Sequence, residues 1–128
     1  MKRRLIVVAV VLFALVAFVG FSLLAPGAVR AQTADDCVHA PTIDSLETCV
    51  EHAAQQGFID NQGVTNSLLA KLDAAQAALD RGQTSVAINN LEAFIHEVQA
   101  LAGKHIEQMH AQHMVMHAQM VIQALKNG

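Results

Sequence analysis

Residues 63–104 read GVTNSLLAKLDAAQAALDRGQTSVAINNLEAFIHEVQALAGK, and this stretch decides the fold. Apolar side chains recur in it at intervals of three and four residues, which is the spacing of one face of an α-helix. Gly82 interrupts this pattern and Gly103 ends it, as glycine commonly does just after a helix. The stretch therefore predicts two amphipathic helices, over about 61–81 and 85–102, joined by a turn so short that they pack antiparallel.

Two further helices are expected on either side of this hairpin, one over about 42–56 and one over about 104–126. The expected N-caps are Thr42, Asp60, and Thr84 or Ser85. No segment shows the alternation of a strand, so the sequence predicts an all-α domain over residues 42–127. This domain is expected to be a compact bundle of about four helices that contains the antiparallel hairpin.

The N-terminus has the organisation of an export signal. Residues 1–4 are MKRR, an uncharged and mostly apolar run follows over residues 5–25, and small residues lead to Ala31. This order is typical of a secretory signal peptide, here residues 1–31 with cleavage after Ala31. Because about 20 apolar residues can cross a bilayer, the alternative is an uncleaved anchor over residues 5–25. Both interpretations place the rest of the chain outside the cytoplasm, either secreted or in the cell envelope.

Removal of the signal peptide would leave an acidic chain. Four of the eight basic residues lie within residues 1–31, whereas all eleven acidic residues follow, so the mature charge is −7 with neutral histidines. A surface of this sign repels the phosphate backbone of nucleic acids and disfavours binding to anionic lipid. Nucleic acid is therefore not an expected partner, and membrane contact is expected only through an uncleaved N-terminal segment.

The only two cysteines are Cys37, in a polar tether over residues 32–41, and Cys49, in the first predicted helix. Export favours disulfides, so we expect these two residues to be bonded. Closing a loop of about 13 residues would stabilise the domain by roughly 3 kcal/mol. The alternatives are a pair of buried free thiols and a metal site formed by Cys37, His39, Cys49 and His52.

Several short segments of the hairpin and of the last helix carry a resemblance to a known family. They are NSLLAKL (66–72), AAQAAL (74–79), AINNL (87–91), AFI (93–95), GK (103–104) and the AQ pair at 118–119. Together they resemble the FIMAH domain, over residues from about 58 to 125. Members are small helical modules, often attached to secreted bacterial proteins with enzymatic or adhesive domains. The resemblance implies an exported bacterial accessory or interaction module, and it implies no catalytic residues.

The last predicted helix departs from the family's pattern in its histidines and methionines. Four of the seven histidines and four of the five methionines of the chain lie there. At 100° per residue, three imidazoles fall within an arc of about 60° and three thioethers within an adjoining arc of about 40°. The imidazoles belong to His110, His113 and His117, and the thioethers belong to Met109, Met116 and Met120.

Imidazole suits copper, zinc and nickel, whereas thioether suits Cu(I), so this stripe is a candidate metal site with copper as its cofactor. The candidate ligands are His110, His113, His117, Met109 and Met116. The plainer interpretation is core packing, because methionines on an apolar helix face usually fill gaps between helices. The third interpretation is a surface for helix packing or self-association. Protonation of the three histidines near pH 6 would add repulsion, so the last helix is expected to loosen in mild acid.

No pairing of a nucleophile with a base, no phosphate-binding glycine loop and no H-E-x-x-H motif occurs in the sequence. We therefore predict that the chain is not an enzyme and has neither catalytic residues nor a cofactor. The expected function is that of an exported helical module for protein–protein interaction or structural support. Its partner would be another exported protein or a second copy of the chain. The rival function is copper binding outside the cytoplasm through the stripe of the last helix.

Overall fold

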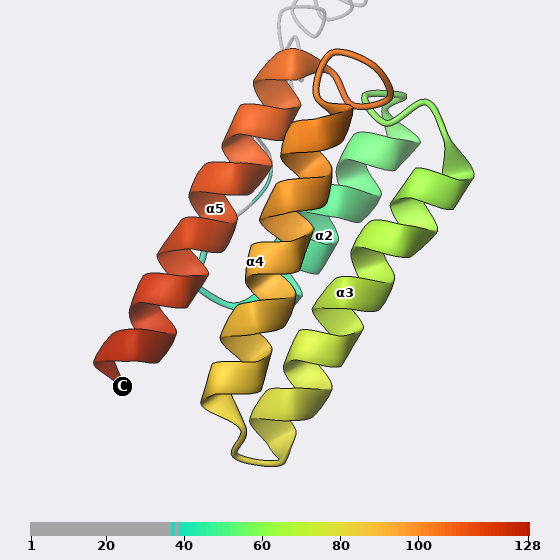
Figure 1. Cartoon of the computed structure of the whole chain (residues 1–128). Coiled ribbons are helices and arrows are strands. Elements are labelled where there is room, and N and C mark those ends of the chain that lie inside the picture. The colour runs from blue at the N-terminus through green and yellow to red at the C-terminus, as the bar shows by residue number, and fades with distance from the viewer. Residues whose placement is uncertain (1–36, 38) are drawn as a thin grey trace, which may run out of the picture. The chain divides into compact units, whose positions relative to one another are not determined.

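Four helices make up the part of the chain that the computed structural model describes, which is Cys37 and residues 39–128. They are α2 (Ile43–Gln55), α3 (Gln62–Asp80), α4 (Thr84–Leu101) and α5 (Gln108–Asn127). Successive helices run in opposite directions (Figure 1). Each helix packs against the next, and α5 returns to pack against α2, which closes the bundle. The prediction of an all-α bundle with an antiparallel hairpin is confirmed. The expected signal peptide, residues 1–31, lies outside the described residues.

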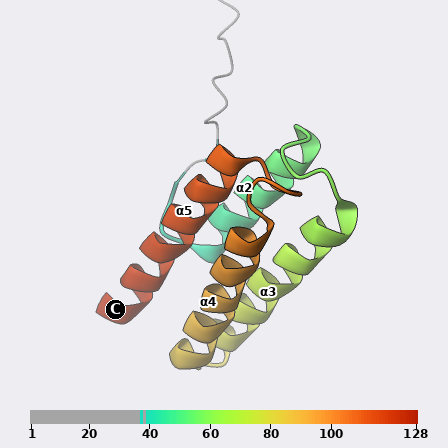
Figure 2. The same cartoon turned by 45° about the horizontal axis from the view of Figure 1, so that its top comes forward.

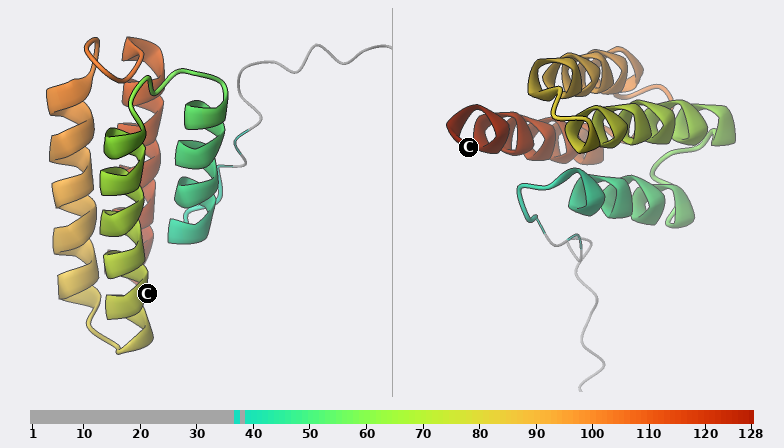
Figure 3. Two further views of the ribbon diagram at one scale, coloured as in Figure 1. Left: turned by 90° about the vertical axis from the view of Figure 1, so that its right-hand side faces the viewer. Right: turned by 90° about the horizontal axis from the view of Figure 1, so that it is seen from below.

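The turned views show the four helices lying side by side (Figures 2 and 3). The shortest of them is α2. None of the described helices combines the length and the apolar character that crossing a membrane requires.

The helix ends show which sequence signals act locally. Thr42 caps α2 as expected, since its side-chain oxygen accepts a hydrogen bond from the amide of Ser45 at 3.3 Å. The expected cap of α3, Asp60, is wrong: Asn61 fills this role and accepts from two amides, at 2.8 and 3.3 Å. Asp60 instead accepts a hydrogen bond from His105 Nδ1, 2.9 Å away. Its carboxylate is therefore engaged by a residue that is distant in the sequence.

The start of α4 also differs from the expectation. Thr84 is already the first helical residue, and Gln83 occupies the N-cap position without a capping hydrogen bond from its side chain. The reason lies in the turn before it. Gly82 adopts a φ of +71°, and the amides of Gly82 and Gln83 bond back to carbonyls at the end of α3, at 2.8 and 2.9 Å. The glycine-terminated turn has the length that the sequence indicated but lies one residue earlier, because α3 ends at Asp80, so α4 also begins one residue sooner.

The last helix begins at Gln108 rather than at residue 104. Residues 102–107 form a loop that pairs its backbone with the connection between α2 and α3. The amide of Asp60 donates to the carbonyl of His105 at 3.1 Å, and the amide of Glu107 donates to the carbonyl of Phe58 at 2.8 Å. Ile106 is 1% exposed in this loop and lies opposite Ile59. Burial of this isoleucine and its neighbouring backbone bonds therefore outweigh the helical propensity of the segment.

The core lies between the four helices and consists mostly of leucine, isoleucine, valine and alanine. Its largest member is Phe94 in the middle of α4, which has no exposed surface. The other large side chains with less than 2% exposure are Leu46, Leu68, Leu72, Leu91, Ile106, His117, Val50, Val98 and Val121. His117 is the exception in this list, because it carries polar nitrogen atoms into an otherwise apolar layer.

Truncation of Phe94 tests whether α4 carries the centre of this core. We expect Phe94→Ala to lower the free energy of unfolding by about 3–5 kcal/mol, because it removes a ring and leaves a cavity that four helices enclose. Urea unfolding followed by circular dichroism measures this change. The matched control is Val86→Ala on the same helix, where the side chain is 42% exposed. A change of more than about 1 kcal/mol is not expected there, and equal losses in the two variants would contradict this account of the core.

Candidate functional site

The three histidines of the predicted stripe lie on α5, but the structure places each in a different environment. His117 is buried at 1% exposure, and its Nε2 lies 2.7 Å from the carbonyl oxygen of Ala40. A carbonyl can only accept, so Nε2 carries the hydrogen and Nδ1 holds a lone pair in the neutral ring. Nδ1 is buried and has no hydrogen-bond partner among the described residues. His117 thus holds the segment before α2 against α5.

Burial controls the charge of His117. Removal from water lowers the pKa of this imidazole, and the nearby His39, whose ring centroid lies 5.2 Å away, lowers it further. The hydrogen bond to Ala40 acts in the opposite direction, but burial has the larger effect. We therefore expect His117 to be neutral in the folded protein.

His110 sits at the first turn of α5 and has two partners of its own. Its ring stacks on Phe58 with centroids 3.6 Å apart, and its Nδ1 lies 2.5 Å from Oε2 of Glu107. Glu107 is also the N-cap of α5, where Oε2 accepts a hydrogen bond from the amide of His110 at 3.1 Å. The hydrogen bond from the His110 ring, followed by that from its backbone, lowers the pKa of this carboxyl. His110 therefore stabilises the N-terminus of α5 together with Glu107.

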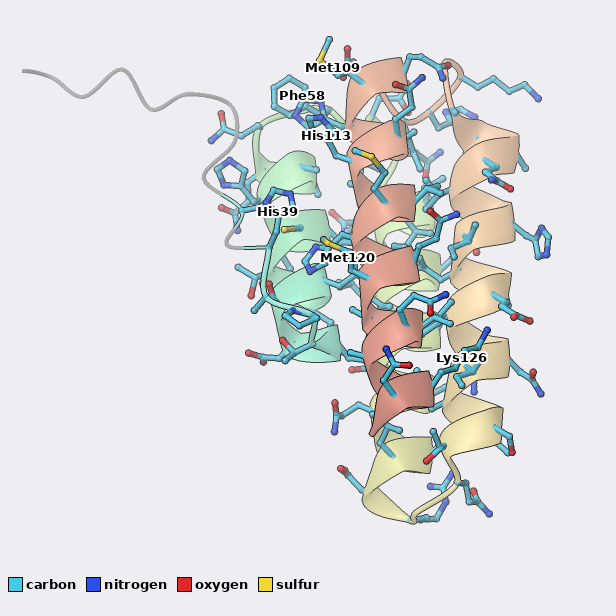
Figure 4. The ribbon with its side chains drawn as sticks, turned by 90° about the vertical axis from the view of Figure 1, so that its left-hand side faces the viewer. His39, Phe58, Met109, His113, Met120 and Lys126 are labelled. Atoms are coloured by element: carbon cyan, nitrogen blue, oxygen red, sulfur yellow. The ribbon has the colours of Figure 1, made fainter. Side chains whose placement is uncertain are left out.

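His113 is half-buried, whereas three methionines of α5 are exposed. The rings of His113 and His110 meet edge to face at 6.4 Å. Three of the four large apolar side chains exposed in the described part are methionines of α5, namely Met109 at 60%, Met116 at 53% and Met120 at 42%. Figure 4 shows Met109, His113 and Met120 on one flank of this helix.

The predicted ligand set is not assembled as one cluster. Within residues 37 and 39–128, no group of three or more histidine, cysteine or acidic side chains is arranged to hold a metal ion. His117 faces the core and Ala40, whereas His110 faces Phe58 and Glu107. Of the five candidate ligands, Met109, His113 and Met116 follow one another at helical spacing along α5. The metal site and its copper cofactor remain predictions.

Cys37 and Cys49 are brought together by the same fold that buries His117. Both are free thiols in the structure, with Cys49 buried and Cys37 half-buried. Burial raises the pKa of the Cys49 thiol, and a hydrogen bond with Cys37 raises it further. Because the thiolate is the reactive form, Cys49 is protected from reagents in water as long as the segment before α2 stays in place.

A groove runs between α4 and α5 in the described part of the chain. The section beside the N-terminal half of α5, here called the upper section, has a volume of about 440 Å³. The lower section, beside the C-terminal half, has a volume of about 770 Å³, and Met116 lines both. Glutamines and small or branched apolar side chains make up most of the walls. These are Gln99, Gln108, Ala111, Gln112 and Val115 above, and Ile95, Gln119, Ile122 and Gln123 below. Only the lower section includes charged residues, Glu92 and Lys126.

Sequence reasoning missed this groove and the contacts that divide the histidines. The glutamines of α5 recur at helical spacing, so a shared face could have been recognised, but only the packing of α4 makes it a groove. Neither Ala40 nor Phe58 carries any sequence signal as a histidine partner. Met120 lay in the predicted arc of thioethers but outside the proposed ligand set.

The architecture and surface define a small helical module with a groove on one side, and the comparison with known families agrees. The model of the FIMAH domain matches residues 43–123, which is more than half of the chain. The chain belongs to the FIMAH domain family, whose members are helical modules found in secreted proteins. The match includes α2, which the resemblance noted in the sequence left out. No curated protein and no solved structure matches the chain.

Acid should destabilise the fold through His117. Its pKa in the folded protein lies below the ordinary value of 6.5, so the unfolded chain binds a proton more readily. Stability is therefore complete above the ordinary value and falls as the pH drops below it. We expect the urea midpoint to decrease between about pH 7.5 and 5.5, and His117→Gln, which keeps a donor for Ala40, to weaken this dependence. His96→Gln, an exposed position on α4, is the control. Parallel profiles for all three proteins would contradict the assignment.

The proximity of the two thiols supports the predicted disulfide. We expect the protein recovered after export to be lighter by two hydrogen atoms than the reduced chain and to lack thiols that react under denaturing conditions. Mass spectrometry and a thiol assay measure these properties. Reduction should then lower the free energy of unfolding by roughly 3 kcal/mol or less. Two reactive thiols in the exported protein would show that the pair remains reduced.

Proposed function

We propose that this chain is a non-enzymatic module that binds another protein outside the cytoplasm through the groove between α4 and α5. The proposal rests on the groove, which is lined by apolar side chains and by a row of glutamine amides. Charged residues occur only in its lower section. Such a surface complements an amphipathic helix whose contacting face is apolar and uncharged. The family supports the location, since FIMAH domains occur in secreted proteins.

The charge of the domain favours a different protein over a second copy. Residues 37–128 contain four basic and nine acidic side chains, so two copies repel each other at long range. Interface cores are generally poor in charged residues and rich in methionine, as this groove is. The partner that fits is therefore an exported protein that presents an uncharged helical face.

Site-specific cross-linking tests this function. A photoreactive amino acid replaces Gln112 or Gln119 in the groove, and Gln76 on α3 is the matched control, since all three are exposed glutamines. Irradiation in the cells that make the protein should yield one discrete adduct from the groove positions and none from the control. Mass spectrometry identifies the partner, and an adduct of twice the chain mass would indicate self-association instead.

Charge substitutions control for nonspecific cross-linking. Gln119→Glu is combined with the photoreactive residue at 112, and Gln112→Glu with the photoreactive residue at 119. Each change keeps the shape of the side chain and adds charge to the groove, so the adduct should be lost. Gln76→Glu adds the same charge to α3 and should leave the adduct unchanged. An adduct that survives the added charge in both of these proteins would exclude this surface as the binding site.

A further inference from the structure

We propose that Met116 and Met120 are modification sites, at which a two-electron oxidant such as hydrogen peroxide forms methionine sulfoxide and closes the groove to its partner. This inference rests on the proposed function, because it concerns the regulation of the same groove. A methionine sulfoxide reductase reverses the modification. The groove therefore binds its partner only while both thioethers are reduced.

The two methionines are the large exposed apolar side chains of the groove. Met116 lines both of its sections and Met120 lines the lower one, with exposed fractions of 53% and 42%. Apolar neighbours on the same walls lie deeper, since Ala111 is 3% exposed and Ile122 is 6% exposed. An apolar helix that enters the groove thus meets the thioethers first.

The chemistry of the walls makes these two positions the oxidisable part of the docking surface. The other apolar groups of the groove are hydrocarbon side chains of alanine, valine and isoleucine, which peroxide does not attack. Methionine is flexible and fits irregular apolar surfaces, as leucine would also do in part. A thioether differs from leucine in that it accepts an oxygen atom and becomes polar.

The reaction is a balanced transfer of one oxygen atom. A lone pair of the sulfur attacks peroxide, an S–O bond forms, the O–O bond breaks, and the second oxygen leaves as water after a proton shift. The sulfur loses two electrons and the peroxide gains them. In the reverse direction, two thiols of the reductase supply two electrons and two protons, become a disulfide, and release the oxygen as water.

The cysteines do not protect the methionines from the oxidant. Cys49 is buried, and burial raises the pKa of its thiol, whereas the thiolate is the form that reacts. The predicted disulfide with Cys37 would remove both thiols. A thioether needs no ionisation, so Met116 and Met120 react in the form that is always present.

Oxidation changes the docking surface and leaves the core intact. Met114 on the inner face of α5 is 3% exposed, so the packing between the helices keeps its thioether. A sulfoxide in the groove holds water that docking must remove, and burial of a polar group without a partner is unfavourable. We therefore expect the modified groove to bind about tenfold more weakly, with the fold unchanged.

Peptide mapping of the purified exported chain after treatment with hydrogen peroxide tests the modification itself. We expect Met116 and Met120 to gain one oxygen atom each well before Met114 does, while circular dichroism shows an unchanged helix content. Oxidation of Met116 and Met120 that is no faster than that of Met114 would overturn the inference.

Cross-linking then tests the effect on docking. The chain with a photoreactive residue in place of Gln112 is oxidised, freed of peroxide with catalase, and added to the exported fraction of cells that lack its gene. Only this chain meets the oxidant, so the partner stays unmodified. After irradiation we expect about tenfold less adduct than from the untreated chain, and recovery after treatment with methionine sulfoxide reductase and its thiol reductant.

Leucine variants assign the effect to the groove, because leucine keeps the apolar character without the sulfur. The double variant Met116→Leu/Met120→Leu should form the adduct equally well before and after peroxide. Met109→Leu is the matched control: Met109 is 60% exposed on the same helix but does not line the groove. This variant should lose the adduct after peroxide as the parent does.

Two outcomes would overturn this inference alone. One is an adduct from the parent that peroxide leaves unchanged, and the other is loss of the adduct in the double leucine variant as well. Absence of any adduct from the untreated parent would overturn the docking function and this inference with it. Failure of the regulation is thereby distinguished from failure of the proposed function.

Discussion

The tight turn between α3 and α4 is the constraint on which the rest of the bundle depends. Gly82 provides a positive φ that other residues rarely adopt, and this lets two long helices fold back on each other within three residues. Their apolar faces then meet around Phe94 and Leu72, which are fully buried. α2 and α5 complete the enclosure, since an amphipathic hairpin by itself leaves half of its apolar surface in water.

The short segment before α2 is a structural member of the domain as well as a tether. Ala40 accepts the hydrogen bond of buried His117, and Cys37 contacts Cys49 on α2. These contacts join the segment before α2 to the face where α2 and α5 meet. A polar ring in an apolar layer is stable only while such a partner is present, because an unpaired buried polar atom is costly. The segment and the last helix therefore stabilise each other.

α5 presents two surfaces with different chemistry. Its inner face packs into the core through Met114 and Val121, and the side toward α4 lines the groove with glutamines. His113, Met116 and Met120 line the groove together with these glutamines, and Met109 is exposed at the first turn of the helix. Because a helix separates residues by 100° steps, a single helix can serve the fold with one set of side chains and a partner with another.

The sequence by itself determined the number of helices, the hairpin and the family, because helical periodicity and glycine stops are local signals. Thr42 was recognised as a cap for the same reason. Tertiary structure decided what local signals do not contain. It drew Asp60 toward His105, turned residues 104–107 into a loop through the burial of Ile106, and placed three histidines of one helix stripe in different environments. Spacing along a helix fixes the direction of a side chain, whereas its chemical role depends on which segment packs opposite, and here those segments lie up to 77 residues away.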